Sequence, residues 1–268
     1  MPYNSNRFGS PINISKHSTK AIQPELEMLQ KNPSSITLDR KAATHYRSIV
    51  GKVLYLSNTI RPDISYTVSQ LSKHLKQPTI NDLAAAKHLI RYIAGTTHHG
   101  IIYSKTKKNV IEGYCDSSWT DDYETSTSTG AYIFKYANGA ITWKSKIQSN
   151  VSLSTAESEY YSAGSAAKEL IWLDELFNEL GIPLKEKILY CDNQSTICMS
   201  ERHGFHNRTK HIRRQWHFIR SHVGKTFKMV YLPTDKMKAD FLTKGLAPLS
   251  HQNMLTLNNI IDMRKSNG

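Results

Sequence analysis

The stretch VSLSTAESEYYSAGSAAKELIWLDELFNELGIP (residues 151–183) decides the fold class. Its apolar side chains recur at spacings of three or four residues, which is typical of a helix with one buried face. The recurring residues are Tyr160, Ala163, Ala167, Leu170, Leu173 and Phe177. Gly181 and Pro183 cannot easily continue a helix, so the pattern predicts one long helix from about Ser154 to Leu180.

Alternation of apolar and polar residues before and after that stretch predicts strands. The runs are VIEGYCDSSW (110–119), GAYIFKYANGAITWKSK (130–146), KILYCDN (187–193) and FKMVYLP (227–233). Asn138-Gly139 divides the second run and indicates a hairpin turn. Shorter helices are predicted at residues 193–201, 208–225 and 235–246. The order predicts an α/β fold in which the long helix allows the strands on either side of it to lie parallel.

Composition divides the chain into four parts. Residues 1–44 are rich in Ser, Asn, Pro and Lys and are expected to be flexible. Residues 45–104 carry two helical patterns, the first broken at Arg61-Pro62-Asp63 and the second capped by Asn81. Residues 109–247 form the predicted α/β domain, and residues 248–268 a C-terminal tail. No stretch approaches the roughly 20 apolar residues of a membrane span, and no secretory leader is expected.

The distribution of charge predicts a polyanionic partner. The net charge is +13, with basic residues in excess over 1–108 and 201–268 and acidic residues in excess over 109–200. Basic flanks around an acidic middle favour a polyanion held by the flanks, and divalent cations bound to the acids are one reason that the middle would not repel it. A solvated acidic surface is the alternative interpretation. The three cysteines form no paired framework, which is typical of a reducing compartment.

Four acids stand at the ends of predicted elements: Asp116, Glu157, Asp192 and Asp240. Asp116 and Asp192 end two strands, and ligands collect at the carboxyl ends of parallel strands. Clustered carboxylates favour Mg²⁺ or Mn²⁺, and two such ions can activate water and stabilise the leaving oxygen of a phosphodiester. Each acid alone also has a structural interpretation, such as an Asx turn at Asp192 or a helix-dipole acid at Asp240.

Glu157 allows two interpretations. Ser154-Thr155-Ala156-Glu157 has the spacing of a capping box, in which the Glu side chain accepts from a backbone N–H at the start of the helix. Glu157 also lies three residues before Tyr160, on the predicted buried stripe, whereas Glu159 is expected to point elsewhere. We therefore predict that Glu157 turns away from the helix start, toward Asp116 and Asp192.

A basic stretch covers residues 201–225. Its apolar stripe predicts a helix packed on the domain, with cationic side chains free to meet phosphates. The candidate nucleic-acid-binding residues are Arg208, Lys210, His211, Arg213, Arg214 and Arg220. An alternative is a zinc site formed by His203 and His206 with Cys191 or Cys198, although the chain has no Cys-x₂-Cys pair to support it.

Several motifs resemble one family. GYCDSSWTDD (113–122), SLSTAESEYYS (152–162), CDNQSTI (191–197), RTKHI (208–212) and YLPTDKMKADFLTKGL (231–246) are similar to the ribonuclease H domain of copia-type LTR-retrotransposon polyproteins. Residues 46–79 and 85–103 resemble the segment that connects reverse transcriptase to that domain. Where the family often has Lys-His-Ile-Asp, this chain has Lys210-His211-Ile212-Arg213.

The resemblance implies a ribonuclease H-like five-stranded mixed sheet of order 3-2-1-4-5, with flanking helices and a preceding helical connection unit. It implies that Asp116 bridges two Mg²⁺ or Mn²⁺ ions, that Asp240 holds the ion on the nucleophile side, and that Glu157 and Asp192 hold the other. The implied partners are an RNA–DNA hybrid and the polymerase part of a retrotransposon polyprotein. A cytoplasmic, virus-like-particle location is implied, with the nucleus as an alternative.

The leading hypothesis is a metal-dependent ribonuclease that hydrolyses the RNA strand of RNA–DNA hybrids. The alternatives are a catalytically silent fragment that only binds nucleic acid, and a scaffold role for the helical unit. Polymerase activity is not expected, because the sequence lacks the Tyr-x-Asp-Asp motif.

Overall fold

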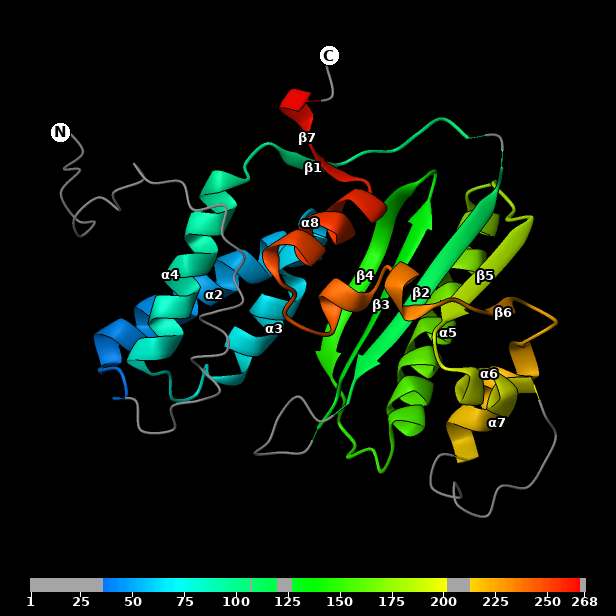
Figure 1. Ribbon diagram of the computed structural model, residues 1–268, viewed down its shortest axis with the longest axis horizontal. Coiled ribbons are helices and arrows are strands. Elements are labelled where there is room, and N and C mark those ends of the chain that lie inside the picture. The colour runs from blue at the N-terminus through cyan, green and yellow to red at the C-terminus, as the bar shows by residue number, and fades with distance from the viewer. Residues whose placement is uncertain (1–35, 107, 120–126, 202–212, 266–268) are drawn as a thin grey trace.

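The computed structural model describes residues 36–106, 108–119, 127–201 and 213–265. Helices α2, α3 and α4 gather on one side of the molecule and a twisted sheet lies on the other (Figure 1). Helix α8 lies between them in this view, and α5 lies behind the sheet. No helix in these described ranges is both long and apolar enough to cross a membrane.

The helical unit forms because its helices bury apolar faces against one another and because α2 and α4 have capped starts. It contains α2 (Arg40–Thr59), the 3₁₀ turn η1 (Pro62–Ile64), α3 (Ser65–Lys73) and α4 (Ile80–Gly95). Asp39 caps α2 by accepting from the Ala42 amide at 2.7 Å. Thr79 and Asp82 form a capping box at the start of α4, so the predicted cap at Asn81 is two residues late.

The sheet has five strands in the order β4-β3-β2-β5-β6. The strands are β2 (Val110–Ser118), β3 (Thr129–Tyr136), β4 (Gly139–Ile147), β5 (Glu186–Cys191) and β6 (Lys228–Tyr231). β2, β3 and β4 are antiparallel neighbours, whereas β2 pairs with β5, and β5 with β6, in parallel. Counted along the domain, this is the order 3-2-1-4-5, which confirms the predicted fold class.

The hairpin between β3 and β4 turns at Ala137 and Asn138, one residue earlier than the Asn-Gly pattern indicates. Both residues have positive φ angles, 50° and 66°, as the favoured two-residue hairpin turn requires. Gly139 is instead the first residue of β4, where a Cβ atom would lie 2.5 Å from the Tyr103 ring. The glycine is therefore needed for a close approach rather than for the turn.

Each face of the sheet buries a separate apolar cluster because alternate strand residues point to opposite faces. On one face, α5 (Thr155–Glu179) packs on β2 and β3, with α6 (Gln194–Glu201) and α7 (Arg213–His222) beside it. This cluster includes Ile111, Phe134 and Leu170. On the other face, Ile133 packs with Phe241 and their neighbours.

The region after β6 differs from the prediction. In place of one helix over 235–246, the structure has two 3₁₀ turns, η3 (Thr234–Lys236) and η4 (Asp240–Leu242). Residues 248–265, predicted as a tail, contain α8 (Pro248–Leu257), β7 (Ile260–Asp262) and η5 (Met263–Lys265). β7 pairs antiparallel with β1 (His99–Ile101) at the end of the helical unit.

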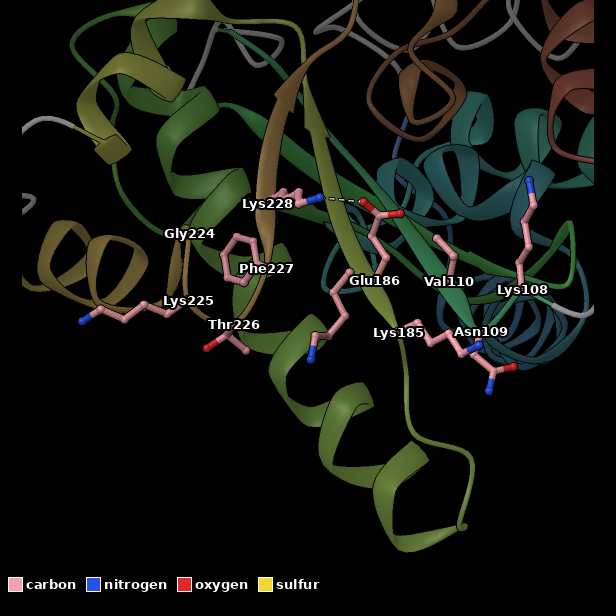
Figure 2. Close-up of a pocket in the computed structure, with 11 residues that line it drawn as sticks. Lys108, Asn109, Val110, Lys185, Glu186, Gly224, Lys225, Thr226, Phe227 and Lys228 are labelled. Atoms are coloured by element: carbon pink, nitrogen blue, oxygen red, sulfur yellow. Dashed lines mark hydrogen bonds and ion pairs between the residues drawn. The ribbon is translucent and has the colours of Figure 1, made fainter.

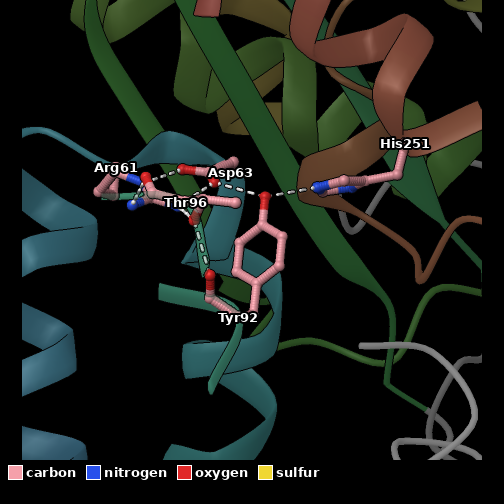
Figure 3. Close-up of polar contacts among 5 residues, drawn as sticks. All are labelled: Arg61, Asp63, Tyr92, Thr96 and His251. Atoms are coloured by element: carbon pink, nitrogen blue, oxygen red, sulfur yellow. Dashed lines mark hydrogen bonds and ion pairs between the residues drawn. The ribbon is translucent and has the colours of Figure 1, made fainter. Parts of the chain in front are cut away.

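A buried polar network joins the helical unit to α8 (Figure 3). Arg61 donates to both oxygens of Asp63, at 2.9 and 2.7 Å, and to the Thr96 carbonyl. The Tyr92 hydroxyl donates to Asp63 Oδ2 at 2.8 Å and lies 3.1 Å from Nε2 of His251, which belongs to α8. The ion pair and its hydrogen bonds connect the helical unit to α8.

Candidate metal centre at the carboxyl edge of the sheet

Two aspartates lie together because β2 and β5 are parallel neighbours. Their register pairs Tyr114 with Tyr190, so Asp116 and Asp192 both lie two residues beyond the last paired position. Asp116 is buried, with 4% of its surface exposed, and Asp192 is half-buried. The predicted convergence of these two acids at one edge is therefore observed.

Asp240 reaches the same edge from the segment that packs on the face of the sheet opposite α5. It begins η4, and Thr243 at the end of this turn donates its hydroxyl to Asp116 Oδ2. Lys244 forms an ion pair with Asp240 Oδ2 at 2.9 Å, and Asp240 Oδ1 is buried without a partner among the described residues. The 3₁₀ turn η4 thus places the Asp240 carboxylate near Asp116 and leaves one oxygen of Asp240 available.

The accumulation of negative charge has a clear effect on Asp116. Burial, and then the nearby Asp240 carboxylate, raise the pKa of Asp116 from 3.8 to about 7. The Thr243 hydroxyl and Lys244 lower it only in part, and Asp192 raises it further. A divalent cation at this position would supply the positive charge that the protein itself does not provide.

Asp192 is oriented by Thr234, the first residue of η3. Its Oδ2 accepts from the Thr234 hydroxyl at 2.8 Å, which leaves Oδ1 for another ligand. The neighbouring Asn193 accepts from the Thr196 amide at 2.9 Å and so caps the start of α6. The local side-chain-to-backbone bond of this segment is therefore a helix cap made by Asn193, whereas the Asp192 side chain accepts from the Thr234 hydroxyl instead.

Glu157 does not point toward these aspartates, and the prediction of its direction is wrong. Its Oε2 accepts from the Leu153 amide at 2.8 Å, and the Ser154 hydroxyl accepts from the Glu157 amide at 3.2 Å. These bonds satisfy free N–H groups at the start of α5 and keep a negative charge at the positive end of the helix dipole. Glu157 is a capping residue in this structure.

Glu159, which was expected to point elsewhere, lies at the carboxylate cluster instead. Its Oε1 accepts from the Ser117 amide on β2 at 3.1 Å, and its Oε2 is buried without a partner among the described residues. Burial raises the pKa of Glu159 well above its usual range, and the charges of Asp116, Cys191 and Asp192 raise it further. Ala163, Ala166 and Leu170 follow Glu159 at helical spacing, so the sequence pattern allows Glu159 on the buried face as well as Glu157 but does not choose between them.

The cluster suits a hard divalent cation. Ligand atoms of Glu159, Cys191 and Asp192 lie within 4.8 Å of one another. Mg²⁺ and Mn²⁺ prefer carboxylate oxygens, and the buried unpartnered oxygens of Glu159 and Asp240 need a positive partner. The buried Cys191 thiol is a soft donor, which these hard cations do not prefer.

Most of the predicted nucleic-acid-binding residues have side chains that the structure does not describe. Arg208, Lys210 and His211 lie outside the described residues, as do His203 and His206 of the zinc alternative. Arg213 and Arg214 belong to α7, but their side chains are not described. Arg220 donates from Nε to the Met199 carbonyl at 2.9 Å, so it holds α7 against α6 rather than reaching freely into solvent.

Comparisons with known proteins give relatives among transposon polyproteins. The chain is 40% identical over 212 residues to a retrovirus-related Pol polyprotein from transposon RE1 of Arabidopsis thaliana, which covers 78% of this chain and 14% of the relative. It is 37% identical over 220 residues to that from transposon TNT 1-94 of Nicotiana tabacum, covering 81% of this chain and 16% of the relative. The chain thus spans only a small part of the curated relatives it matches.

No protein-family model matches the chain. Among solved structures, it is similar to LC11-RNase H1 in complex with an RNA/DNA hybrid. That match has a TM-score of 0.38 and 14% identity, and it covers 50% of this chain and 93% of the other.

Proposed function

Because the chain belongs to the retrovirus-related Pol polyproteins of copia-type transposons, we propose that its α/β part is a metal-dependent ribonuclease H. Its reaction is hydrolysis of the RNA strand of RNA–DNA hybrids. The observation that carries the proposal is the meeting of Asp116, Glu159, Asp192 and Asp240 at one edge of the sheet. Buried carboxylates that lack enough positive partners are what a phosphodiester-cleaving metal centre needs.

The four carboxylates have different positions in this proposal. Asp116 interacts electrostatically with both Asp240 and Asp192, so it is the candidate for a shared ligand. Glu159 and Asp192 lie together on the β5 side. Two Mg²⁺ or Mn²⁺ ions held here would activate water and offset charge on the phosphodiester. This division keeps the roles implied by the family resemblance but replaces Glu157 with Glu159.

Neighbouring polar residues position these ligands. Thr243 and Thr234 donate hydroxyls to Asp116 and Asp192, so one oxygen of each carboxylate is fixed. The Ser117 amide does the same for Glu159. Lys244, paired with Asp240, offsets part of the local negative charge and offers a cation near the path of an incoming phosphate. Fixed ligands reduce the reorganisation that metal binding would require.

A matched pair of substitutions on one helix turn tests the proposal. With a labelled RNA–DNA hybrid and Mg²⁺, we expect Glu159→Gln to lower the cleavage rate by about 100-fold or more. Glu157→Gln should retain most of the activity, because its amide oxygen can still accept from the Leu153 amide. Absence of cleavage by the parent protein, with salt-sensitive hybrid binding, would instead indicate a fragment that only binds nucleic acid.

Polymerase activity is proposed to require a segment outside this sequence, because no Tyr-x-Asp-Asp motif is present. The helical unit and α8 share the network of Arg61, Asp63, Tyr92 and His251, which suits a connection that holds the nuclease in a fixed position. The polymerase part of a Pol polyprotein is the proposed partner. Mixing this chain with such a polymerase and measuring association by sedimentation tests that step.

A further inference from the structure

A lysine-lined hollow lies at the edge of the sheet opposite the carboxylates. The starts of β2, β5 and β6, with the turn before β6, surround a space of about 550 Å³ (Figure 2). Five of its lining residues are lysines: Lys108, Lys185, Lys187, Lys225 and Lys228. Glu186 is the one acid in the lining. This concentration of one charge is far higher than the average for the chain.

Only part of this positive charge is compensated within the protein. Lys228 pairs with Glu186 at 2.8 Å, as Figure 2 shows, and Lys187 pairs with Asp174 at 2.8 Å. Lys108, Lys185 and Lys225 are exposed, and no described carboxylate lies within ion-pair distance of them. Three ammonium groups, carried by three separate segments around the hollow, therefore remain for a ligand.

The backbone around the hollow is already hydrogen-bonded. The Lys185 amide donates to the Asn109 carbonyl at 2.7 Å, and the Gly224 amide donates to the Phe227 carbonyl at 2.9 Å. The amides of Lys225 and Thr226 donate to the His222 carbonyl at 3.1 and 2.7 Å. A small anion usually needs a nest of free N–H groups, and these amides do not offer one. The hollow instead suits a ligand with several separated anionic groups.

We propose that this hollow is a second nucleic-acid contact, which binds phosphates of the backbone away from the metal centre. Lysine ammonium groups bind phosphate as mobile point charges, and an open hollow accepts a continuous strand. The choice of nucleic acid as the polyanion rests on the proposed function. The charge arrangement itself does not depend on catalysis.

The distance between the two sites sets the length of nucleic acid that can use both. Val110 borders the hollow and Asp116 lies six residues further along β2. At about 3.3 Å per residue the two are about 20 Å apart, which is about six phosphates at about 3.4 Å each along one strand. Nucleic acids shorter than this should gain nothing from the lysines when they are held at the carboxylates.

The test removes the three uncompensated charges together. Lys108→Ala/Lys185→Ala/Lys225→Ala is compared with the parent and with a control triple variant, Lys41→Ala/Lys52→Ala/Lys87→Ala, which removes equal charge from exposed positions on α2 and α4. Binding of a long RNA–DNA hybrid, of single-stranded DNA and of polyglutamate is measured by salt titration in EDTA, so that no cleavage occurs. Circular dichroism checks that both variants are folded.

We expect the slope of log K against log salt for the hybrid to fall in magnitude by up to about 2.7 in the hollow variant, since each lost contact removes about 0.9. The control triple variant should keep the parent slope. An unchanged slope in the hollow variant, or a loss confined to polyglutamate, would overturn the inference. Hybrid cleavage is measured in a separate assay. If the parent protein does not cleave the hybrid, the proposed ribonuclease activity is wrong, but a changed salt slope would still support this second contact.

Discussion

The crowded carboxylates predict that Asp116→Asn stabilises the protein when no divalent cation is present. The folded protein raises the pKa of Asp116 to about 7, mainly through burial and then through Asp240. Between pH 3.8 and about 7 the folded state therefore holds a proton that the unfolded state releases. Stability must fall as pH rises through this interval, because the folded state binds more protons than the unfolded state.

The magnitude follows from the size of the interval. The difference between 3.8 and about 7 corresponds to about 4 kcal/mol of folding free energy at pH 8, at about 1.4 kcal/mol for each pH interval of one. Asparagine has nearly the same shape, carries no charge and still offers an oxygen to the Thr243 hydroxyl. Asp116→Asn should thus recover up to about 4 kcal/mol at pH 8 and almost nothing near pH 4.

Urea unfolding in EDTA at pH 4, 6 and 8 measures this effect, with a second series in saturating Mg²⁺. Bound Mg²⁺ should stabilise the parent but not Asp116→Asn, so the advantage of the variant shrinks or reverses. Asp174→Asn is the control, because it removes an acid that is paired with Lys187 at 2.8 Å and should not stabilise. If Asp116→Asn is no more stable than the parent at pH 8 in EDTA, the electrostatic description of the site is wrong.

Three further substitutions test separate parts of the structure by urea unfolding. Gly113→Ala should cost about 1–3 kcal/mol through overpacking, because a Cβ atom there would lie 2.3 Å from the buried ring of Phe134; an unchanged midpoint would contradict the register of β2 and β3. Tyr92→Phe should cost about 1.5–3 kcal/mol, since it removes a hydrogen bond to the buried carboxylate of Asp63; a neutral result would mean that the network does not hold the units together. Glu157→Gln should cost about 0.3–1 kcal/mol by weakening the interaction with the helix dipole, and a much larger loss would mean that Glu157 does more than cap α5.

Periodicity alone was enough to predict most of the fold. The strands of the sheet and α5 follow alternating and helical patterns that burial imposes, and the long helix between β2 and β5 made parallel pairing the natural solution. Periodicity gave the wrong prediction for the segment after Pro233, where the structure has η3 and η4 instead of one helix. The residues from Ala239 to Thr243 are all buried, so no single helical face separates buried from exposed positions, and the segment forms short turns over the sheet instead of a helix.

The candidate site was predictable where strand ends define it and not where a helix face does. Asp116 and Asp192 follow strands whose parallel pairing fixes the edge they share. The apolar stripe of α5 could not distinguish Glu157 from Glu159, because both acids are buried at the start of the helix. The distinction lies in contacts with β2, where Ser117 receives Glu159, and no single-sequence pattern contains that contact.

The two acids of α5 cannot exchange roles, because a helix turns about 100° per residue and residues two apart point about 200° apart. A side chain at 157 can reach back to the Leu153 amide, and one at 159 can reach forward to Ser117 on β2. Small residues support this second direction. The Ser162 hydroxyl donates to the Asp116 carbonyl at 2.6 Å, and the Ser117 and Ser158 hydroxyls lie 2.9 Å apart, so α5 approaches β2 closely enough for Glu159 to lie beside Asp116. The capping bond and the proposed metal ligation therefore belong to two different carboxylates, Glu157 and Glu159, which lie two residues apart on α5.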